Sequence, residues 1–141
     1  MKLKGKCLNP GIAKGEALVT SIPVSFFGEI DASSGKITSP HHEHFGKSIT
    51  GKIFVVPTGK GSSGGPNVVY SMKLRGTLPV GMIVGKNEPT LAAGILTGNI
   101  PAVTNLDQDP TIVIKTGDYV KIDATNGTVV VISKKSKNEI I

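Results

Sequence analysis

The sequence predicts one domain of mixed α/β class: a β-rich, barrel-like body with an embedded β-α-β-α-β unit and a C-terminal hairpin. A length of 141 residues is typical of a single domain. Between residues 52 and 104, short apolar runs alternate with two helical patterns, which indicates parallel strands joined by right-handed crossovers. Near the C-terminus, two apolar segments flank Asn126-Gly127, the strongest short signal for a hairpin.

The first part of the chain is predicted to be β structure followed by a long loop. Leu3–Leu8 is a short strand candidate, and Asn9-Pro10-Gly11 predicts the turn after it. Gly15–Ile22 is the second strand candidate. Residues 28–47 are typical of a loop, because they contain Ser33-Ser34-Gly35, a Ser-Pro pair and all three histidines.

The middle of the chain supplies the β-α-β-α-β unit. Residues 52–56 form a β-branched apolar run, typical of a strand buried on both faces. A helix is predicted over Asn67–Leu74, because Pro66 suits a first helical position and Gly76 lies just beyond the end. The remaining elements are a strand at Met82–Val84, a helix at Pro89–Leu96 and a strand at Pro101–Thr104.

The predicted hairpin ends the domain. Its strands are Asp118–Thr125 and Thr128–Ser133. We therefore assign residues 1–133 to one domain and residues 134–141 to a basic tail that we expect to be disordered.

The cysteine content limits the metal chemistry of this chain. Cys7 is the only cysteine, which excludes a disulfide within the chain and a cage of four thiolates. It also excludes an iron–sulfur cluster held by this chain alone. Cys7 itself is interpreted as a small buried apolar residue, because no neighbour in the sequence would activate its thiol.

The net charge of +6 first suggests a nucleic-acid partner. However, six lysines lie at the two ends, at positions 2, 4, 6, 134, 135 and 137. Ten basic and nine acidic side chains fall between residues 7 and 133, so the body carries a charge of +1. Aromatic residues, on which bases would stack, are few. We expect no nucleic-acid partner.

A membrane partner is not expected either. The longest apolar runs contain four or five residues, far fewer than the roughly 20 of a membrane span. The start Met-Lys-Leu-Lys-Gly-Lys has no apolar secretion segment. We therefore expect a cytoplasmic protein.

The segment Val56-Pro-Thr-Gly-Lys-Gly-Ser-Ser-Gly-Gly-Pro66 is the strongest candidate for a functional site. It joins a buried strand to a helix, and its four glycines allow a ligand to approach the backbone closely. The free N–H groups of the helix start, the hydroxyls of Ser62 and Ser63 and the ammonium of Lys60 can bind an anion. The alternative is a flexible turn in which a serine caps the helix.

Two phosphate-binding patterns were compared with this segment. The P-loop pattern fails, because Gly61 rather than Ser or Thr follows Gly59-Lys60. Gly59-Lys-Gly-Ser-Ser-Gly64 matches the dinucleotide pattern, with Glu88 as the acid further on. Dinucleotide binding stays open but is disfavoured, since this glycine pattern alone is weak and the chain has only one β-α-β-α-β unit.

Three histidines cluster in Pro40-His-His-Glu-His-Phe45. His41, His42 and His44 could bind zinc together with Glu43, but the spacing that organises such ligands on a helix is missing. A solvated loop, available to contact a partner, is the favoured interpretation. Arg75, the only arginine, is assigned to the end of the first helix, where a cation complements the helix dipole.

Three separated motifs resemble one protein family, in the same order. They are Gly15-Glu-Ala-Leu-Val19, then Phe26-Phe-Gly-Glu-Ile-Asp31 followed by Gly35, and Gly51-Lys-Ile-Phe-Val-Val-Pro-Thr-Gly-Lys-Gly-Ser-Ser63. The family is the small subunit, or swivel domain, of aconitase X-type hydro-lyases, and the resemblance extends from about residue 5 to residue 133. It implies a swivelling β/β/α domain that is inactive without a large subunit, which holds an iron–sulfur cluster or an iron centre.

The resemblance also implies residue roles. The family's catalytic proton acceptor is the first serine after the glycine–cation–glycine turn, which is Ser62 here. We expect Lys60, Gly61, Ser63 and Gly64 to place an anionic small-molecule substrate. True aconitases resemble this segment but carry Ser-Ser-Arg, whereas Gly64 follows Ser63 here. An arginine clamp on the substrate carboxylate must then come from elsewhere, and we expect the large subunit to supply it.

The resemblance leaves the substrate open between two hydroxy acids. The family includes the archaeal phosphomevalonate dehydratases and bacterial cis-3-hydroxy-L-proline dehydratases. A separate small subunit of this length favours dehydration of (R)-5-phosphomevalonate to trans-anhydromevalonate 5-phosphate, a step of isoprenoid biosynthesis in a mevalonate pathway. Ser39–Gly46 is closer to some hydroxyproline dehydratases. A non-catalytic nucleotide- or anion-binding module is the alternative from a different class.

Overall fold

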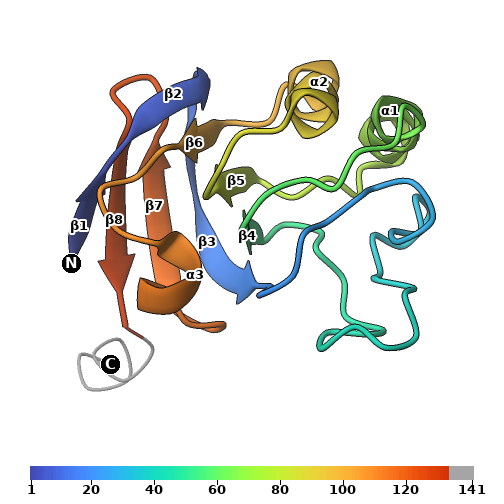
Figure 1. Cartoon of the computed structure of the whole chain (residues 1–141), viewed down its shortest axis with the longest axis horizontal. Coiled ribbons are helices and arrows are strands. Elements are labelled where there is room, and N and C mark those ends of the chain that lie inside the picture. Colours follow the sequence, from blue (N-terminus) through green and yellow to red (C-terminus); the bar gives the residue numbers. More distant parts are fainter. Residues whose placement is uncertain (134–141) are drawn as a thin grey trace.

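The structure, a computed structural model, describes residues 1–133, so the predicted basic tail at 134–141 lies outside the described residues. Within residues 1–133, eight strands form one sheet in the order β1-β8-β7-β3-β4-β5-β6-β2, and three helices accompany it (Figure 1). The strands are β1 (Lys2–Lys4), β2 (Lys6–Asn9), β3 (Ile12–Val19), β4 (Ile53–Val56), β5 (Gly81–Val84), β6 (Ala102–Thr104), β7 (Tyr119–Asp123) and β8 (Thr128–Ile132). The helices are α1 (Gly65–Arg75), α2 (Pro89–Gly98) and α3 (Pro110–Val113).

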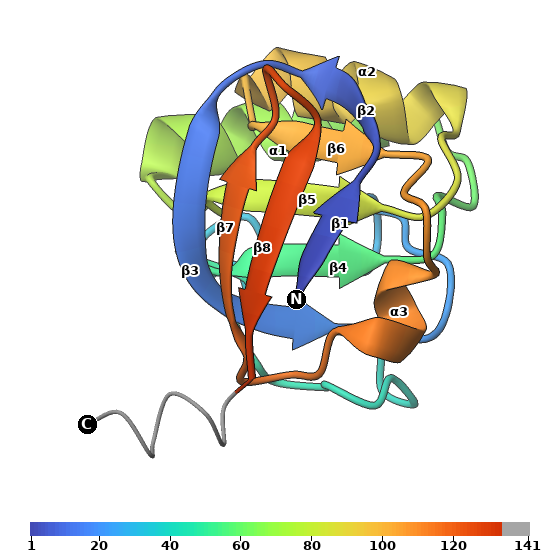
Figure 2. The same ribbon diagram turned by 90° about the vertical axis from the view of Figure 1, so that its left-hand side faces the viewer.

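The sheet bends into two layers, and the helices α1 and α2 form a third. β3, β4, β5 and β6 run parallel, whereas β7, β8 and β1 continue from β3 in antiparallel pairs. Figure 2 shows β7, β8 and β1 crossing in front of β4, β5 and β6, with α1 and α2 behind them. β3 belongs to both layers, because Ile12–Glu16 pair with β7 and Ala17–Val19 pair with β4. The predicted α/β class with its β/β/α arrangement is confirmed.

Successive side chains of the central strands point to opposite faces of the sheet, which divides the hydrophobic core into two clusters. Ile53 and Val55 of β4 pack between the two β layers, while Phe54 and Val56 pack against α1 and α2. All four residues of β4 are therefore buried, as expected for a strand covered on both faces. The predicted β-α-β-α-β unit is confirmed, and it brings the segment after β4 to the carboxyl edge of the parallel strands.

Two strand predictions near the N-terminus need correction. The strand predicted at Leu3–Leu8 is divided at Gly5, because Lys2–Lys4 pair with β8 whereas Lys6–Asn9 pair with β6. The strand predicted at Gly15–Ile22 begins at Ile12, where pairing with β7 starts, and ends at Val19. The turn predicted between them is present, with Gly11 at a φ of 134°.

The helix boundaries follow the predicted signals closely. α1 extends beyond the predicted Asn67–Leu74 at both ends and is followed by Gly76, whose φ of 74° is left-handed. α2 extends past the predicted Leu96 to Gly98 and is followed by Asn99 with a φ of 51°. α3 was not predicted, since four residues are too few to show a helical period. Within residues 1–133, none of the helices combines the length and the apolar character needed to cross a membrane.

The C-terminal hairpin is confirmed, but its turn differs from the two-residue turn that Asn126-Gly127 suggests. Asp123 pairs with Thr128, which leaves a four-residue loop. The N–H of Gly127 donates to the carbonyl of Ala124 at 3.1 Å, and Gly127 has a φ of 71°.

Candidate functional site

The glycine- and serine-rich segment follows β4 and lies against an earlier segment of the chain. Val24 forms a parallel bridge with Gly59. The N–H of Val24 donates to the carbonyl of Thr58, and the N–H of Lys60 donates to the carbonyl of Val24, each at 3.1 Å. Residues 24–29 thus form one wall of the site. They overlap the motif Phe26–Asp31, which is therefore brought beside the motif Gly51–Ser63.

Ser62 has an unusual backbone conformation. Its φ is 90°, next to Gly61 at 94°, and it is one of three non-glycine residues with positive φ within residues 1–133. Such a conformation costs energy for a residue with a Cβ atom and is often found at functional sites. The Ser62 carbonyl accepts from the N–H of Gly65 at 3.2 Å, and Ser62 Oγ accepts from the N–H of Gly64 at 3.4 Å. The start of α1 therefore supports the strained turn.

Close packing explains two glycines of the segment. A Cβ atom at Gly59 would lie 2.5 Å from Oε1 of Glu88. One at Gly64 would lie 2.5 Å from the ring of Phe27. Gly61 is required by its positive φ instead. The match to the dinucleotide pattern at these three positions thus has a local structural reason.

Glu88 connects the start of α2 to this segment. Its carboxylate accepts from the N–H groups of Thr90 at 2.8 Å and Leu91 at 3.1 Å, and it is the N-cap of α2. Desolvation acts to raise the pKa of Glu88, but hydrogen bonds from Thr90, Leu91 and the backbone of Gly61 outweigh it and lower the pKa. The charged carboxylate of Glu88 therefore stabilises the start of α2 and the turn at Gly61.

Lys60 forms an ion pair with Glu29. The other oxygen of Glu29 accepts from the N–H of Ser25 at 2.9 Å. The Glu29 side chain is 15% exposed and the Lys60 side chain 51% exposed. The carboxylate is thus held by the wall of the site, whereas about half of the Lys60 side chain is accessible to solvent.

These residues border a shallow, open depression of about 460 Å³. Its lining consists of Ser25, Phe27, Gly28, Glu29, Lys60, Gly61 and Ser62. Ser62 also borders a cavity of about 10 Å³, on the scale of one water molecule. Of the predicted site residues, Lys60, Gly61 and Ser62 line the depression, while Ser63 and Gly64 lie outside its lining.

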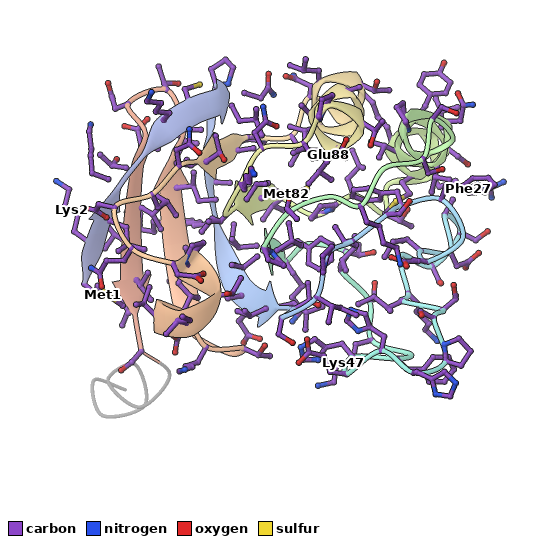
Figure 3. All side chains as sticks on the ribbon, in the orientation of Figure 1. Met1, Lys2, Phe27, Lys47, Met82 and Glu88 are labelled. Atoms are coloured by element: carbon purple, nitrogen blue, oxygen red, sulfur yellow. The ribbon has the colours of Figure 1, made fainter. Side chains whose placement is uncertain are left out.

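Reasoning from the sequence did not assign Ser25, Phe27 and Glu29 to the site. The only signal for them was the motif Phe26–Asp31 in the family resemblance. Figure 3 shows Phe27 and Glu88 in the half of the molecule that carries α1 and α2, opposite Met1 and Lys2.

The N-terminus of α1 has no side-chain cap in the described part of the chain. Its N-cap is Gly64, no side chain within residues 1–133 caps it, and its first turn contains no acidic residue. The alternative of a turn with a capping serine is therefore wrong. The helix dipole favours a negative charge at this place, although the N–H of Gly65 is already bonded to the Ser62 carbonyl and Pro66 has no N–H.

The histidine-containing loop is packed more tightly than a solvated loop. His42 is 8% exposed, and its Nε2 lies 3.0 Å from Oγ1 of Thr20. Its Nδ1 accepts from the N–H of His44 at 2.9 Å, so the ring proton of the neutral form is on Nε2. His44 Nε2 contacts the carbonyl of Val19 at 2.6 Å. The solvated interpretation is wrong for His42, although His41 and Glu43 are exposed.

Glu43 closes this loop onto the end of β3. Its carboxylate accepts from the N–H of Ser21 at 2.6 Å, a hydrogen bond that lowers the pKa of Glu43. Desolvation lowers the pKa of His42 and so favours the neutral ring. Within residues 1–133, no group of three or more His, Cys, Asp or Glu side chains is arranged to hold a metal ion.

The structure also places Cys7 and Arg75. Cys7 is exposed on β2, so its interpretation as a buried apolar residue is wrong. β2 pairs only with β6, at the end of the sheet order, which leaves that side chain in solvent. Arg75 lies in the last turn of α1, as predicted, and its Nε donates to Oγ of Ser71 at 3.3 Å.

An iron–sulfur cluster does not fit the residues of this chain. A cluster needs several thiolates, and the one cysteine is on an outer strand, away from the lining of the depression. We therefore derive no chemical step through a cluster bound to this chain.

Comparison with known proteins places this geometry in a family. The family model described as "Aconitase X swivel domain" matches residues 2–131. The phosphomevalonate dehydratase small subunit of Methanosarcina acetivorans is 38% identical over 135 residues, covering 96% of this chain and 94% of the relative. That of Pyrococcus horikoshii is 40% identical over 134 residues, covering 95% and 98%.

Solved structures agree with the sequence comparison. The crystal structure of the holo-form of Thermococcus kodakaraensis aconitase X matches with a TM-score of 0.89 at 38% identity, covering 94% of this chain and 99% of that one. The solution NMR structure of a UPF0107 protein matches with a TM-score of 0.86 at 36% identity, covering 94% and 100%. The resemblance inferred from three sequence motifs is confirmed. This chain belongs to the aconitase X swivel-domain family and is a subunit of a hydro-lyase.

Proposed function

We propose that this chain, together with a large subunit, forms the active site of a dehydratase that removes water from (R)-5-phosphomevalonate. The observation that carries the proposal is the conformation of Ser62. This serine has a φ of 90° and lines an open depression beside Lys60, at the position of the family's proton acceptor. A hydroxyl held by a strained backbone beside an ammonium group is what a positioned base requires.

The chemistry of the reaction explains why Ser62 needs this surrounding. Dehydration of a β-hydroxy acid begins with removal of the proton α to the carboxylate, and the β-hydroxyl group then leaves. A serine hydroxyl is a weak base unless its alkoxide is stabilised. The Gly64 N–H at 3.4 Å from Ser62 Oγ and the start of α1 provide positive potential for that alkoxide.

The donor groups beside Ser62 support an anionic substrate. Lys60 contributes an ammonium, Gly61 brings the backbone close, and Ser63 and Gly64 lead into the uncapped start of α1. We assign these four residues to placing the substrate. The names of the relatives, which are 38–40% identical, support phosphomevalonate as that substrate.

The proposal includes a partner and a cofactor. The relatives are named small subunits, and the depression is open to solvent. We propose that the large subunit closes this opening and holds the iron–sulfur cluster or iron centre expected for the family. The electrophile that assists departure of the hydroxyl then comes from outside this chain.

The test is reconstitution of the complex. The chain is co-expressed under anaerobic conditions with the proposed large subunit, and dehydration of phosphomevalonate and of cis-3-hydroxy-L-proline is measured. We expect turnover of phosphomevalonate, and loss of at least about a thousandfold in kcat for Ser62→Ala, with assembly intact. Ser71→Ala, on α1 outside the depression, is the matched serine control and should keep full activity.

Two results would contradict the proposal. A near-normal kcat in Ser62→Ala would exclude Ser62 as the catalytic base. Turnover of cis-3-hydroxy-L-proline without turnover of phosphomevalonate keeps the dehydratase but replaces its substrate.

A further inference from the structure

We propose that Glu29 is an internal counter-ion that competes with anionic ligands for Lys60, and so sets the affinity of the depression for anions. This inference rests on the proposed function only in taking Lys60 as the anion-binding group. Glu29 acts through Lys60 and is therefore a specificity-determining residue rather than a catalytic one.

The first support is the charge of the lining. Among the described residues that line the depression, Lys60 is the only cation and Glu29 the only carboxylate. The two side chains form an ion pair, so their charges cancel inside the depression. An anion that approaches Lys60 therefore meets a neighbouring negative charge.

The second support is the difference in how the two partners are held. One oxygen of Glu29 accepts the Ser25 N–H at 2.9 Å, and the side chain is 15% exposed. Apart from the ion pair with Glu29, Lys60 is held by its backbone N–H, which donates to the carbonyl of Val24, and its side chain is 51% exposed. The carboxylate is thus fixed, while the ammonium, on four methylenes, can turn toward a ligand.

An ammonium has three donors, so Lys60 can contact Glu29 and a ligand anion at the same time. A small anion such as phosphate gains only this shared contact and meets repulsion from Glu29. A substrate that also contacts the large subunit has further interactions to offset that repulsion. Glu29 therefore makes tight binding of an anion depend on the assembled complex. The depression selects its ligand through an unfavourable contact that only the full substrate offsets.

The test uses inorganic phosphate as the probe and Glu29→Gln as the variant. Glutamine keeps an acceptor for the Ser25 N–H but removes the charge. The matched control is Glu16→Gln, because Glu16 pairs with Lys52 outside the depression and its loss changes the net charge equally. Phosphate affinity of the full chain is measured by NMR titration. We expect the Kd to fall about three- to fivefold in Glu29→Gln, the effect of one exposed ion pair, and to stay unchanged in Glu16→Gln.

A double-variant cycle identifies the cation. The gain in Glu29→Gln should disappear when Lys60→Gln is added, because no ammonium is then available. Affinity that is unchanged, weaker or undetectable in Glu29→Gln overturns the inference, as does an equal gain in Glu16→Gln. If Glu29→Gln melts below the assay temperature, Glu29→Asp is measured instead. Its shorter side chain withdraws the charge from Lys60, and a Kd equal to that of the unmodified chain would overturn the inference.

Kinetics of the complex separate this role from a structural one. With the large subunit present, Glu29→Gln should lower both the inhibition constant of phosphate and the KM of phosphomevalonate, without raising kcat. A higher KM would indicate a merely structural role and overturn the inference. Failure of the proposed function leaves a different pattern: the phosphate Kd responds to Glu29→Gln, but the complex dehydrates neither substrate.

Discussion

The carboxylate of Glu88 occupies the space that a side chain on Gly59 would need. A Cβ atom at Gly59 would lie 2.5 Å from Oε1 of Glu88 and 2.8 Å from Cβ of Leu91. Through this contact the start of α2 lies directly against the turn that contains Ser62. The first residues of α2 are therefore coupled to the geometry of the candidate site.

Gly59→Ala should consequently distort the site. The added methyl must displace Glu88 or the turn, which we expect to cost about 1–3 kcal/mol of unfolding free energy and to lower kcat of the complex. Urea unfolding and the dehydration assay measure the two effects. Gly65→Ala is the control, because its Cβ would meet nothing within 4 Å. Equal behaviour of the two variants would contradict this account of Gly59.

Ser62→Gly should separate stability from activity. Glycine relieves the strain of the left-handed φ, so the variant should be more stable, by about 1 kcal/mol, yet lose turnover with the hydroxyl. Ser62→Ala should lose turnover without gaining stability. Thermal or urea unfolding of the three forms tests this. A Ser62→Gly variant less stable than the unmodified chain would show that the serine conformation is not strained.

Glu88→Ala should weaken α2 in a pH-dependent way. Loss of the N-cap hydrogen bonds is expected to cost about 1 kcal/mol near neutral pH. Since the pKa of Glu88 is lowered in the fold, its stabilisation is complete above the unfolded value of 4.5 and is lost as the pH falls through the folded pKa. Urea unfolding across this pH range should therefore bring the variant and the unmodified chain together in acid. A constant difference would contradict the role of the charge.

His42 should make the fold sensitive to mild acid. Its Nδ1 faces the N–H of His44 and its pKa is lowered, chiefly by desolvation. The unfolded chain therefore binds the proton first, so stability is full above the unfolded value of 6.5 and decreases as the pH falls toward the folded pKa. His42→Gln should flatten this slope in unfolding experiments, whereas His41→Gln, at an exposed position in the same loop, should retain it. A slope unchanged in His42→Gln would assign the dependence to another group.

Local patterns were sufficient for much of the fold. The run at 53–56, with every residue apolar, indicated burial on both faces, because only a strand between two layers can bury all its side chains. Pro66 indicated the start of α1, because proline has a fixed φ and lacks the N–H that a first helical turn leaves unbonded. Gly76 indicated its end, because glycine readily adopts the left-handed φ that follows a helix. The division of β1 from β2 at Gly5 was not predictable, because it follows from a change of partner strand, from β8 to β6, and both partners lie far along the chain.

In the candidate site, too, some features follow from local sequence and others only from tertiary contacts. By itself, the sequence determined the β-α-β-α-β unit, the glycine-rich segment after β4 and, through resemblance to the family, Ser62 as the candidate base. It could do so because these features depend on neighbouring residues and on short motifs. Only the tertiary structure decided that Glu29 neutralises Lys60, that Glu88 is used to hold the turn and that His42 is buried. Each of these depends on contacts between segments separated along the chain, and such contacts exist only once the sheet has brought the segments together.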